Sequence, residues 1–313
     1  MPPVAPYTLL INDEDRASIV AAARALLDAA LPPDLRDDRF SEAWEQAVIA
    51  RAIPFWSCVA FQGSTPVGYL AGLVDDGILA LEALYDPEIA DQAELARSQL
   101  EALVGSLPGD DLGDVEAVEI WAKPAPDWFG PIVVDAGFSP YRGLHQMRRP
   151  LPIGEPAPVT SRSFRSSDTD ALRLVNNRSF ANHPSQGDQS ATRWRETIDA
   201  PWFRNDGTRI YEDPEGTIAG FCITKIHHDP PLGEIYVIGL DPSVHGRGLG
   251  GPMTAAGLHW LADQGLTTAM LYVEADNAAA IRTYRRLGFE IVRSDQAWRL
   301  DLEPLSRVEI DTP

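Results

Sequence analysis

The chain has 313 residues, of which 44% are hydrophobic and 23% charged, and its formal net charge is −20. That length exceeds what one hydrophobic core usually supports, so two domains are expected. The negative charge disfavours nucleic acid and anionic membranes as partners. An apolar run of about 18 residues and a signal-like N-terminus are both missing from the sequence, which predicts a cytoplasmic protein.

The only two cysteines, Cys58 and Cys222, lie in apolar, strand-like surroundings in different halves of the chain. This placement favours buried core thiols over a disulfide. The six histidines lack metal-ligand spacing, so no metal is expected. We further expect the protein to act as a monomer.

Each half is predicted to begin with helices. The spacing of Ala and Leu residues after Ile19 predicts an amphipathic helix over residues 15–30. Similar patterns predict helices over 42–51 and, in the second half, over 167–179. Mixed strands and two further helices are expected to follow in each half, which makes the fold class α+β.

The segment 147–158 is predicted to be an extended linker, because it holds four prolines at 150, 152, 156 and 158. Each proline disfavours helix in the residue before it and donates no ladder hydrogen bond. We place the domain boundary here, which gives domains at 1–152 and 153–313.

Three short runs recur in the same order on both sides of this linker. They are TPVGYL at 65 and TIAGFC at 217, EALYDP at 82 and YVIGLDP at 236, and AGF at 136 and LGF at 287. A period of about half the chain indicates a tandem of two similar domains rather than a solenoid.

A glycine-rich run, DPSVHGRGLGG, extends from Asp241 to Gly251. The apolar, strand-like segment from Ile235 to Leu240 leads into it, and a helical pattern follows. Such a turn directs several backbone N–H groups at one place and favours phosphate binding. A dinucleotide fold would need GxGxxG with an acidic residue about 20 positions on, and a P-loop would need Gly-Lys-Ser/Thr. Both alternatives fit the sequence worse.

After the next strand-like segment, Ala269 to Val273, residues 277–289 read NAAAIRTYRRLGF. The pattern (R/Q)xxGx(G/A) followed by NxxAxxxYxxxGF resembles the acetyl-CoA site of GNAT acyltransferases. The resemblance implies two tandem GNAT domains, each a mixed, mostly antiparallel sheet flanked by helices, with acetyl-CoA as acyl donor.

The same resemblance implies a binding role for each part of the motif. The end of the strand would pair with the pantetheine arm, the loop would hold the pyrophosphate, and the next helix would line the cofactor. The residues concerned are Ile238, Gly239, Leu240, His245, Gly246, Arg247, Gly248, Leu249, Gly250, Gly251, Asn277, Ala278, Ala279, Ala280, Ile281 and Arg282. His245 stands where the family usually has Gln or Arg, a small departure because the main chain does most of the binding.

Two side chains are candidates for proton transfer. Tyr284 falls where the family places its general acid, and a phenol with a pKa of about 10 stays neutral and can protonate a departing thiolate. Glu234, which precedes the Ile235 strand, is the candidate general base, directly or through water. The structural alternatives are a tyrosine packed in the core and a solvated glutamate.

The first half differs at both corresponding places. Glu88 and Glu94 stand in the segment where the second half has its glycines, and Val133 stands where the second half has Tyr284. Carboxylates at a helix start repel phosphate. We therefore predict that the N-terminal domain is a degenerate GNAT-like domain without catalytic function.

Several runs also resemble the mycothiol synthases within this family. They are MRRPL at 147, VNNRSFANHPSQG at 175, TKIH at 224, GEIYV at 233 and LYVEADN at 271. The resemblance implies acetylation of the cysteinyl amine of cysteinyl-glucosaminyl-inositol. It implies that Lys225 and Tyr272 contact the acceptor's hydroxyls, with Glu234 near the amine and Glu45 reaching it from the first domain. Ser185 stands where these enzymes usually have an acidic residue.

Two other functions stay open. One is a tandem GNAT enzyme acting on another small-molecule amine, such as an aminoglycoside-like or amino-acid acceptor. The other is an acyl-CoA-binding regulator without turnover. The combination of Tyr284 and Glu234 with a complete glycine loop favours catalysis, since a sensor has no use for a thiolate proton donor.

Overall fold

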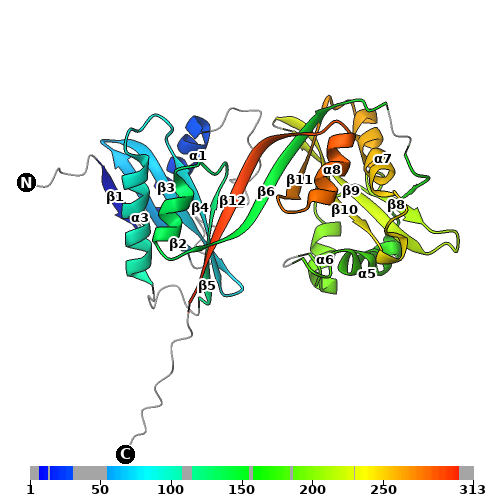
Figure 1. Cartoon of the computed structure of the whole chain (residues 1–313), viewed down its shortest axis with the longest axis horizontal. Coiled ribbons are helices and arrows are strands. Elements are labelled where there is room, and N and C mark those ends of the chain that lie inside the picture. The colour runs from blue at the N-terminus through cyan, green and yellow to red at the C-terminus, as the bar shows by residue number, and fades with distance from the viewer. Residues whose placement is uncertain are drawn as a thin grey trace, which may run out of the picture. The chain divides into compact units, whose positions relative to one another are not determined.

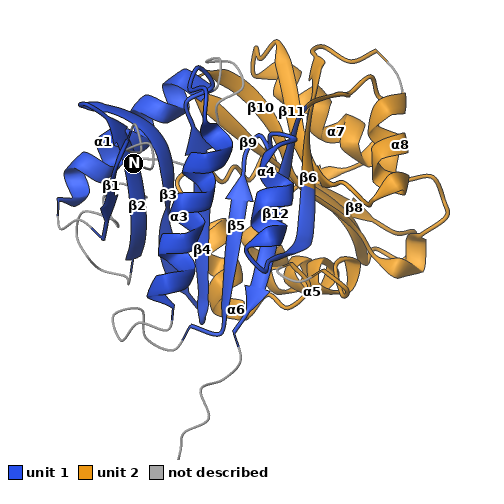
Figure 2. Cartoon of the chain, turned by 60° about the vertical axis from the view of Figure 1, so that its left-hand side comes forward, with its two compact units in different colours: residues 1–143, 293–313 blue, residues 144–292 orange. Residues whose placement is uncertain are grey.

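The computed structural model describes residues 7–12, 15–30, 55–107, 115–154, 158–183, 186–228 and 230–302. The chain forms two compact units (Figure 2). Unit 1 comprises Met1–Gly143 with Arg293–Pro313, and unit 2 comprises Leu144–Val292. The helix predicted over 42–51, together with Glu45 and Ser185, lies outside the described residues.

In the described residues of unit 1, six strands form a sheet with helices on both faces. Its strands, in spatial order, are β1 (Thr8–Ile11), β2 (Phe55–Gln62), β3 (Thr65–Asp75), β4 (Ile78–Tyr85), β5 (Ala117–Ala122) and β12 (Glu290–Asp301). All neighbours are antiparallel except β4 and β5. One helix, α1 (Arg16–Ala30), packs against one core cluster, and α3 (Gln92–Ser106) and α4 (Phe129–Asp135) pack against another. The helix predicted over 15–30 is confirmed by α1.

Unit 2 follows the same plan. Its strands, in spatial order, are β6 (Ser139–Pro150), β11 (Thr268–Glu274), β10 (Pro231–Leu240), β9 (Ile218–His228), β8 (Arg209–Glu212) and β7 (Arg162–Ser163). All neighbours are antiparallel except β10 and β11. The mixed, mostly antiparallel α+β architecture predicted for each half is therefore confirmed.

Helices cover both faces of the unit 2 sheet (Figure 1). On one face α5 (Thr169–Ser179) and α6 (Ala191–Ile198) bury Val175 and Trp194 against the sheet. On the other face α7 (Gly250–Asp263) and α8 (Ala278–Arg286) bury Met253 and Ile281. The helix predicted over 167–179 is confirmed, with a 3-10 turn over Ser166–Asp168 preceding α5.

The last strand of each sequence repeat belongs to the unit built mainly from the other repeat. In β12, residues Gln296–Asp301 pair with β5, and Trp298 lies in the unit 1 core. In β6, residues Leu144–Pro150 pair with β11, and Met147 lies fully buried in the unit 2 core. The division at 152/153 follows the sequence repeats and stays a prediction, whereas these compact units follow strand pairing.

Both cysteines lie in the core, as predicted. Cys58 and Cys222 are fully buried, and burial raises the pKa of each thiol to about 12. They therefore stay protonated and pack as small apolar groups. Over the described part of the chain, no helix combines the length and apolar character needed to cross a membrane.

Candidate active site

The parallel strands β10 and β11 pair over only three residues. Gly233–Ile235 lie opposite Ala269–Leu271, whereas β10 stays paired with β9 as far as Leu240. The register shifts between Ile235 and Val237. A bulge of this kind bends its strand and ends local pairing, so the bulge at Tyr236 coincides with the point where β10 separates from β11.

The separated end of β10 directs backbone groups away from β9. The Asp241 N–H donates to the Ala219 carbonyl of β9 at 2.9 Å. Alternate residues of a strand direct their N–H and C=O groups to opposite sides. It follows that Gly239 faces β9, whereas Ile238 and Leu240 face the side where β11 no longer pairs. Of the three predicted backbone contacts, only Ile238 and Leu240 are oriented toward that side, where the Leu240 carbonyl already binds the His245 side chain.

The glycine-rich loop forms a tight, exposed turn onto α7. Gly246 and Gly248 have φ angles of 76° and 72°, which residues other than glycine adopt at a cost. The residue before α7 is Leu249, and it provides no side-chain cap. The first N–H groups of α7, at Gly250 and Gly251, therefore have no partner within the helix and are oriented for an anion.

Side-chain hydrogen bonds brace this loop. The Asp241 carboxylate accepts hydrogen bonds from the Ser243 N–H at 3.0 Å and from Arg178 Nε at 2.6 Å. Burial opposes ionisation of Asp241, but these hydrogen bonds outweigh it and lower its pKa. His245 Nε2 lies 2.9 Å from the Leu240 carbonyl, so its imidazole binds the strand end. Arg247 stays exposed and donates to the Ser243 carbonyl at 3.3 Å.

The second half of α8 lies beside the start of α7. A Cβ placed on Gly250 would lie 3.9 Å from Thr283. Asn277 caps its own helix, because its side-chain oxygen accepts from the Ala280 N–H at 3.0 Å. Ile281 is buried in the core, whereas Arg282 is exposed.

Tyr284 of α8 lies in the core between the sheet and helices α7 and α8. Its ring packs edge-on against Phe289 with centroids 6.0 Å apart, and the residue is 8% exposed. Burial raises the pKa of its phenol above the ordinary value. The hydroxyl therefore keeps its proton throughout the neutral range.

The opposite face of the sheet carries polar side chains where β6, β11, β10 and β9 lie side by side. Leu271 and Val273 of β11 face α7 and α8, so Tyr272 and Glu274 face the other way. Glu234 lies opposite Met270 and Lys225 in register and shares this face. We call the set the polar face; its members are Gln146, Arg148, Lys225, His227, Glu234, Tyr272 and Glu274.

Polar contacts fix several side chains of the polar face. Glu234 is buried, and its carboxylate lies 2.8 Å from His227 Nε2. Gln146 donates to the Tyr272 hydroxyl at 2.8 Å. Near Glu274, His183 Nε2 lies 3.3 Å from the carboxylate. The three predicted acceptor residues of this half, Lys225, Glu234 and Tyr272, therefore lie on one face.

Two aromatic residues extend this face beside Lys225. The Trp202 and Tyr236 rings have centroids 4.6 Å apart. The Lys225 ammonium lies over both, 5.5 Å and 5.8 Å from their centroids. Trp202, His227 and Gln146 were not predicted as site residues from the sequence. For His227 and Gln146 the available signal was alternation along strands next to Glu234 and Tyr272.

The corresponding segment of unit 1 has a different construction. After β4, the Glu88 N–H donates to the Asp86 side chain at 2.9 Å, and α3 begins after Asp91 with Glu94 in its first turn. Carboxylates thus occupy the helix start that carries glycines in unit 2.

Comparison with known proteins places this architecture in a family. A model of the Acetyltransferase (GNAT) family matches residues 171–289. A mycothiol acetyltransferase from Rhodococcus erythropolis is 36% identical over 256 residues, which cover 77% of this chain and 83% of the relative. The chain belongs to the mycothiol acetyltransferase family. A second member, from Salinispora arenicola, is 45% identical over 168 residues, which cover 50% of this chain and 55% of the relative. The chain thus spans about half the length of that relative.

Solved structures support the tandem GNAT fold of this family member. A GCN5-related N-acetyltransferase from Sphaerobacter thermophilus matches with a TM-score of 0.67 at 18% identity, covering 96% of this chain and 97% of its own. A tandem GNAT protein from the clavulanic acid biosynthesis pathway matches with a TM-score of 0.58 at 16% identity, covering 96% and 99%. At these identities the likeness concerns the fold alone.

Proposed function

We propose that this protein transfers the acetyl group of acetyl-CoA to the cysteinyl amine of cysteinyl-glucosaminyl-inositol, forming mycothiol. The observation that carries the proposal is the place where β10 separates from β11. An uncapped helix start, outward-facing strand amides, a buried phenol and a buried carboxylate all belong to the elements that meet there. Membership of the mycothiol acetyltransferase family supports this choice of acceptor.

The donor would bind along the separated end of β10. The N–H groups of Gly250 and Gly251 suit its pyrophosphate, and the backbone groups of Ile238 and the N–H of Leu240 suit the amide-containing pantetheine arm. One of these N–H groups would also stabilise the charge that develops on the thioester oxygen. Gly239, whose backbone groups face β9, would contribute close approach rather than hydrogen bonds.

Acetyl transfer requires two proton movements. The amine nitrogen forms a bond to the thioester carbon while the carbon–sulfur bond breaks. In our proposal Glu234 takes the proton from the amine, and Tyr284 gives a proton to the departing sulfur. Burial raises the pKa of Tyr284, and it also raises that of the core thiol Cys222. The phenol is therefore protonated at neutral pH, as a proton donor must be.

The acceptor would lie on the polar face. Lys225 and Tyr272 would bind its hydroxyls, with Glu234 near the amine. Glu45 would reach it from the N-terminal domain, which we propose carries no catalytic site of its own. The buried, hydrogen-bonded groups on this face would also reject amines that leave them unpaired.

Thiol profiling of cells that lack this protein tests the proposal. Accumulation of cysteinyl-glucosaminyl-inositol and loss of mycothiol are expected, with recovery when the intact gene is returned. The variant Glu234→Gln should restore mycothiol poorly. Unchanged mycothiol in the deletion strain would instead point to another small amine as acceptor.

A further inference from the structure

Glu234 takes a histidine, rather than the cation opposite it, as its partner. In the register of β9 and β10, the residue directly opposite Glu234 is Lys225. Opposite charges at such positions commonly pair. Yet the Lys225 ammonium lies over Trp202 and Tyr236, and the Glu234 carboxylate is bound by His227 Nε2 at 2.8 Å.

The register of the β9–β10 hairpin explains why the His227 side chain can reach Glu234. Leu232 lies opposite His227, and Glu234 lies opposite Lys225 two residues earlier on β9. His227 and Glu234 are therefore diagonal neighbours on one face, a spacing that long side chains bridge. A carboxylate accepts hydrogen bonds only, so a neutral imidazole must carry its proton on Nε2 to make this contact.

The identity of the partner matters because both side chains are buried. The side chains of His227 and Glu234 are only 12% and 8% exposed. A buried carboxylate is costly unless it is paired, whereas pairing with a fixed cation would stabilise its charged form and weaken it as a base. The His227 imidazole satisfies the carboxylate with a hydrogen bond, whereas the Lys225 ammonium would bring a permanent charge.

The contact also orients the carboxylate. His227 occupies Oε2, and no described side chain hydrogen-bonds Oε1. We propose that His227 is a positioning residue, which fixes the Glu234 carboxylate through Oε2 so that Oε1 takes the proton of the acceptor amine. This inference rests on the proposed function, because it assigns Glu234 the role of base.

A double-mutant cycle on the full-length protein tests the inference. We expect His227→Ala to lower kcat by on the order of 100-fold, as misplacement of a reacting group can. The KM for acetyl-CoA should stay unchanged. His227→Gln, whose amide nitrogen can occupy the place of Nε2, should recover most of the loss. In a Glu234→Gln background the His227→Ala change should have little further effect, because its target is already gone.

His228→Ala is the matched control, since this neighbouring histidine is exposed and lies on the alternate face of β9. It should behave as the parent protein does. If the His227 and Glu234 effects multiply, or if His227→Gln is no better than His227→Ala, the positioning role is wrong. A parent protein that acetylates no cysteinyl-glucosaminyl-inositol would overturn the proposed function and this inference together, whereas a normal parent with multiplying effects overturns the inference alone.

Discussion

Tyr284 shows how one buried residue can serve both packing and chemistry. Its ring fills the core against Phe289, while burial raises the pKa of its hydroxyl and keeps it protonated. A structural tyrosine and a general acid would look alike by burial alone. What separates the two roles is the effect of removing only the hydroxyl.

Tyr284→Phe is therefore the decisive change at this position. The ring and its packing are kept, so donor binding should be retained while kcat falls by about 100-fold or more, the usual loss for a general acid. Steady-state kinetics with calorimetric acetyl-CoA binding measures both. Tyr211→Phe, at a half-buried tyrosine of unit 2, serves as the control. Unchanged turnover in Tyr284→Phe would reduce Tyr284 to a packing residue.

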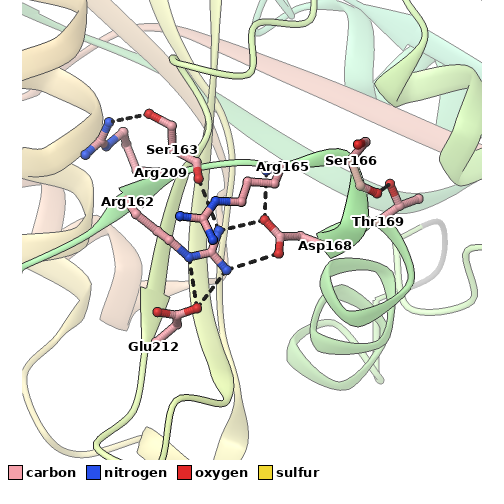
Figure 3. Close-up of polar contacts among 8 residues, drawn as sticks. All are labelled: Arg162, Ser163, Arg165, Ser166, Asp168, Thr169, Arg209 and Glu212. Atoms are coloured by element: carbon pink, nitrogen blue, oxygen red, sulfur yellow. Dashed lines mark hydrogen bonds and ion pairs between the residues drawn. The ribbon is translucent and has the colours of Figure 1, made fainter.

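At the scale of elements, the start of α5 depends on an ion-pair network (Figure 3). Arg162 of β7 binds Asp168 through two nitrogens, at 2.6 and 3.0 Å, and also binds Glu212 of β8 at 2.7 Å. The Arg165 N–H donates to Asp168 at 2.8 Å. Burial opposes ionisation of Asp168, but these hydrogen bonds outweigh it and lower its pKa. The network thus joins the edge strand β7 and its neighbour β8 to the 3-10 turn before α5.

Asp168→Asn should lower the free energy of unfolding by about 2 kcal/mol at neutral pH, as expected for charge-assisted hydrogen bonds. Because the folded pKa is depressed, the stabilisation is present above the ordinary carboxyl pKa of about 3.9 and is lost as the pH falls through the folded value. Urea unfolding from neutral pH to below about pH 4 measures the difference between parent and variant. A difference that does not shrink in acid would contradict the assignment.

The glycine loop offers a second test at this scale. Gly248 and Gly265 have φ angles of 72° and 82°, and a Cβ at either would meet no atom within 4 Å. Alanine at either position should therefore cost a similar backbone strain, of roughly 1–2 kcal/mol. Only Gly248→Ala should weaken acetyl-CoA binding, by roughly tenfold or more, because only this glycine lies in the phosphate loop. Equal affinities of the two variants in calorimetry would remove the loop from the binding site.

At the scale of the whole molecule, strand pairing sets the compact units. Met147 of β6 is fully buried in the unit 2 core, and β6 pairs with β11 from Leu144 to Pro150. A cut at the proline-rich linker would remove this strand from unit 2. The fragment 153–313 therefore lacks strand β6, which the fragment 144–292 keeps from Leu144 onward.

We expect the fragment 144–292 to unfold cooperatively, and the fragment 153–313 to be less stable. Loss of the buried Met147 side chain alone should cost about 2–5 kcal/mol, and β11 also loses its partner. Thermal unfolding followed by circular dichroism compares the two. An equal or higher midpoint for 153–313 would show that the sequence boundary is also the folding boundary.

Features that depend on a short, continuous stretch of sequence could be predicted. The strand, glycine turn and helix around Gly248 are contiguous, and so is the helix that carries Tyr284, which made both recognisable. His227 and Trp202 reach the polar face through strand register and tertiary packing, which no single segment specifies. The exchange of β6 and β12 was missed for the same reason, since alternation marks a strand without naming its neighbour. The role of Glu45 in acceptor binding stays a prediction.

The most direct test follows the purified protein with acetyl-CoA and cysteinyl-glucosaminyl-inositol by mass spectrometry. The account predicts one acetyl group per acceptor, on the cysteinyl nitrogen, formed at a rate that Glu234→Gln and Tyr284→Phe each reduce strongly. Acetyl-CoA binding without any acetylated product, or a product whose rate of formation ignores both substitutions, would contradict it.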